Sequence, residues 1–378
     1  MRLKTINIKN FRNYCSQTLE LCSGVNIISG LNAQGKTNFI EAISIISTGR
    51  SHRTRKEAEL IRWDEDIAEI KAEICEEESC ENDDFTFLDY RFNRDKKKFI
   101  SVNGVKKEKL SELLGHLYTV IFSPDHMSIV KGGPAERRRF MDVALSQLKP
   151  SYYHSLSSYS KVLDQRNMTL QKNRESINLS NLLDVWDKQL VKYGIKIIEE
   201  REIFIKLIKD SASIVCDEVS GKNDKLNVKY VSSIFENSQK HGTMGIGEAF
   251  EKKLFENRNM DIKKGHTSVG PHRDDFSLLV NGREVRNFGS QGQQRTVLLA
   301  LKIAELKIMK EEAGHSPVLL LDDVFSELDS ERKEYLLRYL KGMQSIITCT
   351  DADVIRGLKD VEVIKYFKVE RGNICSYI

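Results

Sequence analysis

Proline and long apolar runs are both scarce in this sequence. Five prolines in 378 residues, with 40 % hydrophobic and 30 % charged residues, indicate a globular chain rather than a disordered or membrane one. No stretch reaches the roughly 18 uninterrupted apolar residues of a membrane span, and the first residues have a strand-like pattern instead of that of a signal peptide. We therefore expect a cytoplasmic protein.

Paired cysteines are also missing. The seven cysteines include no C-x-x-C pair, and no histidine stands at zinc-site spacing from them. They are Cys15, Cys22, Cys75, Cys80, Cys216, Cys349 and Cys375. We expect reduced thiols that mostly fill the core.

The net charge of +4 is too small to indicate nucleic-acid binding by itself, but the charges are segregated. Residues 131–174 contain nine Lys or Arg and three acids, whereas residues 72–90 contain eight acids and no base. The sequence thus predicts a basic face and an acidic lobe.

Hydrophobic patterning predicts an α/β head. Val25–Ile28 reads as a buried parallel strand that ends at Gly30, and a helix with an apolar face begins at Lys36. Residues 67–105 alternate as strands and contain Asn103-Gly104, a pair typical of tight hairpins, so a small antiparallel β lobe is expected.

Helical periodicity dominates from residue 125 to 220. A periodic run of about 40 residues from Asn181 to Val219 predicts a coiled-coil-like arm, with a kink at Gly194. We expect a discontinuous α/β head formed by residues 1–124 and 265–378, with residues 125–264 inserted as a helical arm domain.

A phosphate-binding loop is the strongest motif. Gly30, Leu31, Asn32, Ala33, Gln34, Gly35, Lys36 and Thr37 match the P-loop pattern between a predicted strand and a predicted helix. Backbone N–H groups would surround the phosphates of ATP or GTP, Lys36 would reach the β and γ phosphates, and Thr37 would bind Mg²⁺. A glycine-containing turn that matches by chance is the alternative.

Two carboxylates follow the apolar run Val318–Leu321. This is the Walker B arrangement, in which Asp322 would hold Mg²⁺ and Asp323 would be the candidate base for the attacking water. The alternative is a pair of helix N-caps.

A second anion site is predicted before the helix at residues 297–308. Ser290, Gly292 and Gln293 combine a hydroxyl, a small residue and a helix N-terminus. Because the chain has its own P-loop, this second site would face another molecule. The segment resembles the Ser-x-Gly-Gln signature of ABC and SMC ATPases, and that resemblance implies that Ser290, as a catalytic residue, meets the γ-phosphate bound by a partner subunit. A polar helix cap is the alternative.

These motifs together resemble the RecF family of ABC/SMC-type ATPases. The resemblance also includes residues 7–13, Phe122–Asp125, Lys131–Arg139 and Gly270–Asp275. It implies an ATP-dependent homodimer that binds Mg²⁺ and DNA at single-strand gaps, and that works with RecO and RecR to help RecA load. Ser326–Asp329 matches the D-loop of these families.

Two departures from transporter ABC proteins are shared with RecF-like proteins. Asp323 replaces a glutamate, and Thr350 stands where many such proteins have a switch histidine. Since aspartate is one methylene shorter, it should hold the attacking water less well, so we expect weak ATP hydrolysis.

The basic segment is the candidate DNA surface. Lys131, Arg137, Arg138 and Arg139 would contact phosphates without reading sequence, although a solvated helix face is the alternative. A second candidate patch is Arg50, Arg53, Arg55 and Lys56, and the roles of His272 and Arg273 stay open.

Two other functions fit a P-loop ATPase. A transporter subunit would rarely need a long helical insertion, and an SMC-like chromosome-structuring ATPase would need coiled coils of hundreds of residues. The long insertion disfavours the transporter subunit, and the shortness of the arm disfavours the SMC-like ATPase.

Overall fold

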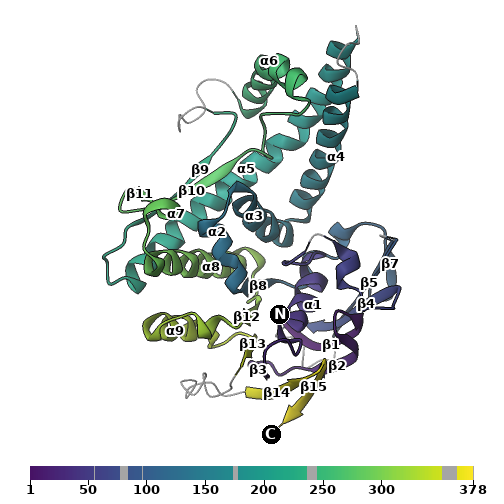
Figure 1. Ribbon diagram of the computed structural model, residues 1–378, viewed down its shortest axis with the longest axis vertical. Coiled ribbons are helices and arrows are strands. Elements are labelled where there is room, and N and C mark those ends of the chain that lie inside the picture. The colour runs from purple at the N-terminus through teal and green to yellow at the C-terminus, as the bar shows by residue number, and fades with distance from the viewer. Residues whose placement is uncertain are drawn as a thin grey trace.

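The computed structural model describes residues 1–54, 56–76, 84–95, 97–172, 178–235, 245–350 and 364–377. Figure 1 shows two sheets at one end of the molecule and a group of long helices that extends from them. Among these residues, no helix is long and apolar enough to cross a membrane.

The first sheet has the strand order β15-β14-β3-β13-β12-β8. Its strands are β3 (Val25–Ser29), β8 (Thr119–Phe122), β12 (Val318–Asp322), β13 (Ser345–Cys349), β14 (Ile364–Glu370) and β15 (Asn373–Tyr377). All pairings are parallel except that of β14 with β15. Every residue of β3, β12 and β13 is buried, as expected for a parallel sheet covered on both faces. The carboxyl ends of β3 and β12 therefore meet at one edge.

The second sheet is antiparallel, in the order β2-β1-β4-β5-β6-β7. Its strands are β1 (Arg2–Phe11), β2 (Tyr14–Glu20), β4 (Ile67–Cys75), β5 (Thr86–Asn93), β6 (Lys98–Val102) and β7 (Val105–Lys107). Asn103 and Gly104 have φ values of 51° and 76°, which confirms the predicted hairpin turn. The short 3₁₀ helices η1 (Glu57–Leu60) and η3 (Leu110–Glu112) flank this sheet.

Helix α1 (Lys36–Thr48) joins the two sheets. Its apolar residues Phe39, Ile40, Ile43 and Ile46 are fully buried in one cluster with residues of β1, β4 and β12. The helix ends at Gly49, whose φ of 68° suits a left-handed cap. This packing fixes the start of α1 at the edge where β3 and β12 end.

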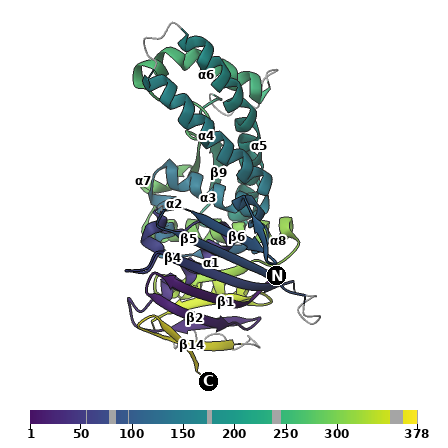
Figure 2. The same cartoon turned by 90° about the vertical axis from the view of Figure 1, so that its right-hand side faces the viewer.

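The helical part follows β8. It contains η4 (Pro124–His126), α2 (Met127–Lys131), α3 (Pro134–Leu148), α4 (Pro150–Lys172), α5 (Leu179–Val219) and α6 (Ile246–Lys264). Figure 2 shows α4, α5 and α6 side by side, extending away from both sheets. The 41-residue α5 confirms the predicted long helix.

Helix α5 is continuous through Gly194. A Cβ at Gly194 would lie 2.6 Å from the Phe250 ring and 3.4 Å from the Tyr159 ring. The glycine therefore permits close packing of α6 and α4 on α5, rather than marking a break in the helix.

The chain then returns to the head. Strand β9 (Leu226–Val231) pairs with β10 (Asp275–Val280), which pairs with β11 (Arg283–Glu284). Next come α7 (Val285–Phe288), α8 (Gln291–Ala313), η5 (Val324–Ser326), α9 (Ser330–Leu337) and η6 (Arg338–Leu340). Since β9 precedes the expected boundary at residue 264 and β10 follows it, the three-stranded sheet connects the two parts. The boundary itself stays a prediction.

The cysteines only partly match the expectation. Cys15, Cys22, Cys216, Cys349 and Cys375 are thiols, and Cys15 and Cys375 are exposed rather than in the core. Cys75 is disulfide-bonded, so the expectation of reduced thiols is wrong for this residue. Cys80 lies outside the described residues.

Candidate nucleotide-binding site

The P-loop has the strained backbone that phosphate binding requires. Ala33 and Gly35 have φ values of 64° and 120°, and Gly35 is the N-cap of α1. A Cβ at Gly30 would lie 2.6 Å from the carbonyl oxygen of Val369, so the loop also needs a glycine where it passes β14.

Lys36 folds back over this loop. Its Nζ donates to the carbonyl oxygens of Gly30 at 2.6 Å and Leu31 at 2.9 Å. Burial lowers the pKa of Lys36, and the nearby Asp323 carboxylate partly opposes that shift. The ammonium thus lies inside the loop, while Leu31 is 74 % exposed.

The Walker B aspartate meets the P-loop directly. Thr37 donates from its hydroxyl to Asp322 Oδ1 at 3.0 Å, and Thr348 donates to the same oxygen at 2.7 Å. Burial raises the pKa of Asp322, and these two hydrogen bonds favour its charged form. A threonine hydroxyl beside a carboxylate oxygen matches the hard oxygen ligands that Mg²⁺ prefers.

Asp323 has an unusual backbone conformation. Its φ of 50° is left-handed, and its N–H contacts the carbonyl oxygen and the hydroxyl of Thr348 at 3.2 and 3.1 Å. The chain therefore turns sharply directly after Asp322, at the end of β12. Thr350 lies just after β13 and is exposed.

A buried carboxylate in α1 escaped the sequence analysis. Glu41 is fully buried, accepts from Arg12 Nε at 2.9 Å and from Ser51 Oγ at 2.5 Å, and pairs with Arg53 at 3.5 Å. Arg53 also donates to Asn38 Oδ1 at 3.1 Å, one residue beyond Thr37. The sequence did contain a signal for this buried ion pair, because Glu41 is an acidic residue on an otherwise apolar face of the predicted helix. Arg53, assigned to a DNA patch, lies beside the nucleotide site.

The second anion motif forms a helix cap. Ser290 Oγ accepts from the Gln293 N–H at 3.2 Å, and Gln293 Oε1 accepts from the Ser290 N–H at 3.0 Å. Gln293 Nε2 also donates to Asp224 Oδ1 at 2.8 Å, and Arg332 donates to the Gly292 carbonyl at 3.1 Å. These contacts fix Ser290 at the N-terminus of α8.

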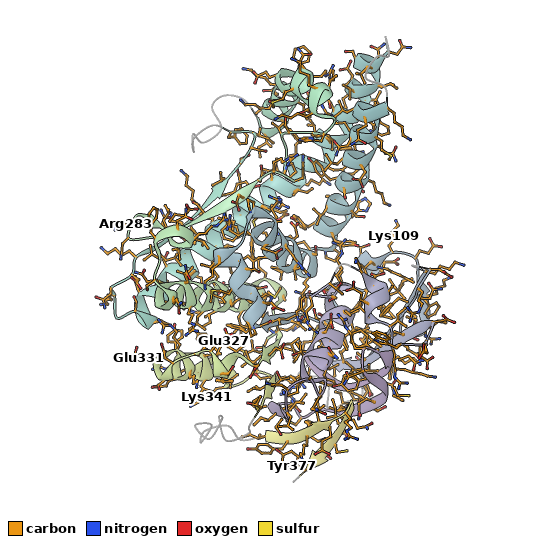
Figure 3. All side chains as sticks on the ribbon, viewed as in Figure 1. Lys109, Arg283, Glu327, Glu331, Lys341 and Tyr377 are labelled. Carbon is orange, nitrogen blue, oxygen red and sulfur yellow. The ribbon has the colours of Figure 1, made fainter. Side chains whose placement is uncertain are left out.

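An open pocket of about 980 Å³ adjoins this cap. Ser290, Gly292 and Gln293 line it together with residues of α9 such as Glu331, which Figure 3 labels. Within the described part of the chain, no P-loop residue lines this pocket. In the D-loop segment, Asp329 caps α9 by accepting from the Arg332 N–H at 3.0 Å.

The structure divides the predicted DNA residues into two groups. Arg137 is buried and forms two 2.7 Å hydrogen bonds to Asp275. Arg138 donates to the Asp274 carbonyl at 2.8 Å and Arg139 to the Ser51 carbonyl at 2.7 Å. Of the four, Lys131 alone is exposed. Arg137 therefore holds α3 to β10 and is no longer a candidate for DNA contact.

Other cations of the basic segment also differ in exposure. Arg166 is fully buried and paired with Asp187 and Asp261, whereas Lys161 and Lys172 are exposed. Arg174 and Arg55 lie outside the described residues. Lys131, Lys161 and Lys172 are exposed candidates for phosphate contacts, and the half-buried Arg138 and Arg139 stay predictions.

Gly270–Asp275 is an internal junction. His272 Nδ1 lies 2.8 Å from the Tyr159 hydroxyl and its Nε2 3.1 Å from the Thr267 carbonyl oxygen. Arg273 donates to the same carbonyl at 3.1 Å. Asp274 accepts from Tyr230 at 2.6 Å. His272 therefore links α4 to the segment before β10, whereas Arg273 is exposed and its role stays open.

Comparison with known proteins agrees with this geometry. The model of the RecF/RecN/SMC N-terminal domain family matches residues 2–374. An Smc head domain from Pyrococcus furiosus shares the fold, with a TM-score of 0.55 at 16 % identity over 99 % of this chain and 96 % of that one. The fold and the site define an ABC/SMC-type ATPase head.

More similar proteins narrow the assignment. The DNA replication and repair protein RecF of Clostridium tetani is 44 % identical over 372 residues, 98 % of this chain and 99 % of that protein. RecF of Clostridium acetobutylicum is 39 % identical over the full length of both chains. A solved RecF–ATP structure, described as the recombination mediator of the RecFOR pathway, has a TM-score of 0.90 at 40 % identity, covering 100 % of this chain and 97 % of that one. The chain belongs to the RecF family.

Proposed function

We propose that this protein is an ATP-driven, DNA-binding dimer of recombinational repair. The observation that carries the proposal is that the P-loop joins Asp322 at one edge of the parallel sheet, while the Ser290 cap borders a pocket that no described P-loop residue lines. A nucleotide held by Lys36 would then meet Ser290, Gly292 and Gln293 of a second subunit.

Thr37 and Asp322 would hold Mg²⁺. The 3.0 Å separation of their oxygens suits ligands of one ion. The bound ion would neutralise charge on the β and γ phosphates, and Lys36 would add a compact positive charge.

Asp323 would orient and deprotonate the attacking water. Its left-handed backbone places it beyond Asp322, and coulombic attraction links it to Lys36. Because its carboxylate is one methylene shorter than that of glutamate, hydrolysis should be slow. Weak, DNA-dependent turnover would make ATP mainly a dimerisation switch.

The relatives supply the biological setting. They are named as replication and repair proteins and as a mediator in the RecFOR pathway. By this similarity, the protein would bind DNA at single-strand gaps and act with RecO and RecR in RecA loading. Exposed Lys131, Lys161 and Lys172 near the arm support contact with DNA phosphates.

An SMC-like scaffold is the second candidate. The 41 residues of α5 span about 60 Å at 1.5 Å per residue, far less than a coiled coil of hundreds of residues. This length favours a local clamp on DNA.

A DNA-binding comparison tests the proposal. ATP-dependent binding should be measured on gapped, linear duplex and single-stranded DNA, with and without RecO and RecR. We expect tightest binding to gapped DNA with ATP; equal binding to all three without nucleotide would reject the proposal.

A further inference from the structure

The turn of the β14–β15 hairpin lies against the P-loop, although more than 330 residues separate them in sequence. The Arg371 N–H donates to Gln34 Oε1 at 2.6 Å, and the Gly372 N–H donates to the Gln34 carbonyl oxygen at 3.1 Å. Figure 3 shows Tyr377, at the end of β15, on the side of the head away from the helical arm.

The β1–β2 turn contacts the same part of the P-loop. Asn13 Nδ2 donates to the same Gln34 carbonyl at 2.8 Å, and the Tyr14 hydroxyl donates to the Gly35 carbonyl at 2.9 Å. Asn13 Oδ1 also accepts from Asn38 Nδ2 at 2.8 Å. Two hairpin turns, β1–β2 and β14–β15, therefore hold Gln34 and Gly35 of the P-loop.

These contacts control the direction of backbone donors. A trans peptide is planar, and its C=O and N–H point in opposite directions. Since Asn13 and Gly372 hold the Gln34 carbonyl, the Gly35 N–H must point away from them. Phosphate binding by a P-loop depends on such N–H groups, and the left-handed φ of Ala33 is a strained conformation of the kind that surrounding contacts hold in place.

The Arg371–Gly372 turn is built for close approach. Arg371 and Gly372 have φ values of 49° and 76°. A Cβ at Gly372 would lie 2.5 Å from the Asn13 carbonyl oxygen, a backbone atom that cannot move independently. The turn therefore fits between the P-loop and the β1–β2 turn only when residue 372 is a glycine.

We propose that Arg371 and Gly372 are positioning residues for ATP: through Gln34 they hold the P-loop in its phosphate-binding conformation. This inference rests on the proposed nucleotide site. In it, the Arg371–Gly372 turn sets the affinity for ATP without contacting the nucleotide. The Arg371–Gly372 turn should affect ATP binding rather than the hydrolysis step. Among the described hydrogen bonds, neither Asp322 nor Asp323 contacts this turn.

Gly372→Ala is the first test, with Gly104→Ala as its control. Gly104 has the same φ of 76° in another hairpin turn, but a Cβ there would meet nothing within 4 Å. Both variants carry the same backbone strain, so only Gly372→Ala should displace the P-loop. We expect about tenfold weaker ATP binding by calorimetry for Gly372→Ala and wild-type affinity for Gly104→Ala.

Gln34→Met is the second test, in case Gly372→Ala does not fold. It removes the side-chain acceptor for the Arg371 N–H. Its control is Gln17→Met, because Gln17 makes the same kind of amide contact with Ile374 of this hairpin, at 2.8 and 2.9 Å, without touching the P-loop. Gln34→Met should weaken ATP binding several-fold by calorimetry, whereas Gln17→Met should bind ATP as wild type does.

Each outcome is decisive. Unchanged ATP affinity in both Gly372→Ala and Gln34→Met would overturn the inference, as would equal losses in the two controls, which would indicate general loosening. A wild-type protein that binds no ATP would instead reject the proposed function.

Discussion

The hydroxyl of Thr37 lies 3.0 Å from the carboxylate of Asp322, although 285 positions separate the two residues in the sequence. Parallel pairing of β12 with β13, and of β13 with β3, brings the two strand ends together. This one contact joins the phosphate loop to the carboxylates and defines the centre of the site.

Lys36→Arg should abolish most hydrolysis. Lys36 is 7 % exposed and its ammonium donates to two carbonyl oxygens, whereas the planar fork of a guanidinium cannot replace a compact ammonium between phosphates. Turnover measured as phosphate release should fall on the order of 100-fold. Thermal unfolding without nucleotide should match wild type. Wild-type turnover in this variant would disprove the phosphate role of Lys36.

Asp323→Asn should separate binding from hydrolysis. The amide keeps the shape of the side chain but accepts a proton far less readily, so turnover should fall on the order of 100-fold while ATP affinity stays within about twofold. Asp323→Glu is the matched variant and should keep hydrolysing. If Asp323→Asn hydrolyses ATP normally, the base must be another group.

Acid should destabilise the fold through buried histidines. Burial lowers the pKa of His52 and of His272 to about 4, from an ordinary value near 6.5. The unfolded chain therefore takes up protons first, so this stability is complete above about pH 6.5 and is lost as pH falls towards 4. Each histidine should lower the free energy of unfolding by about 2 kcal/mol between pH 7 and pH 5.

Urea unfolding at both pH values measures this effect. His272→Gln should show a smaller loss of stability between pH 7 and pH 5 than wild type, whereas the exposed His154→Gln should behave as wild type. Equal pH dependence in wild type and His272→Gln would argue against this assignment.

Alanine substitution should have different effects at Lys131 and Arg137: the first should weaken DNA binding and the second should reduce stability. Lys131→Ala combined with Lys161→Ala should weaken binding to all DNA sequences and reduce the salt slope by about 0.9 for each DNA phosphate that the variant no longer neutralises. Arg137→Ala would leave Asp275 without its buried partner and should cost roughly 3 kcal/mol of stability. Lys341→Ala, on the exposed surface near α9, is the control for DNA binding (Figure 3). A DNA defect without destabilisation in Arg137→Ala would reverse this assignment.

Local patterns predicted the strands and helices around the nucleotide-binding motifs well. The P-loop, the buried strand before Asp322 and the 41-residue helix each follow from neighbouring residues, whose spacing and apolar periodicity are visible in the sequence. The Ser290 cap is also local, since its partner is Gln293.

Long-range pairings were not predictable in this way. A basic run gives no sign that Arg137 pairs with Asp275, 138 positions away, because many acids could serve equally well. Likewise, Gly194 predicted a kink, yet its role depends on Phe250, which arrives from a different helix. Burial and partner choice are set by tertiary packing, which a single sequence does not display.

The central claim is a nucleotide site shared between two subunits. Because ATP would contact both subunits only in the dimer, the nucleotide must strengthen association, and ADP without a γ-phosphate should not. Ser290→Arg places bulk and a cation at the cap of α8, far from the fold's core. It should still bind ATP as a monomer.

Sedimentation velocity of wild type and Ser290→Arg with Mg-ATP and Mg-ADP is the most direct measurement. The shared site predicts a wild-type dimer with Mg-ATP, a wild-type monomer with Mg-ADP, and a Ser290→Arg monomer with both. A wild-type monomer at saturating Mg-ATP, or a Ser290→Arg dimer as stable as that of wild type, would contradict the shared site.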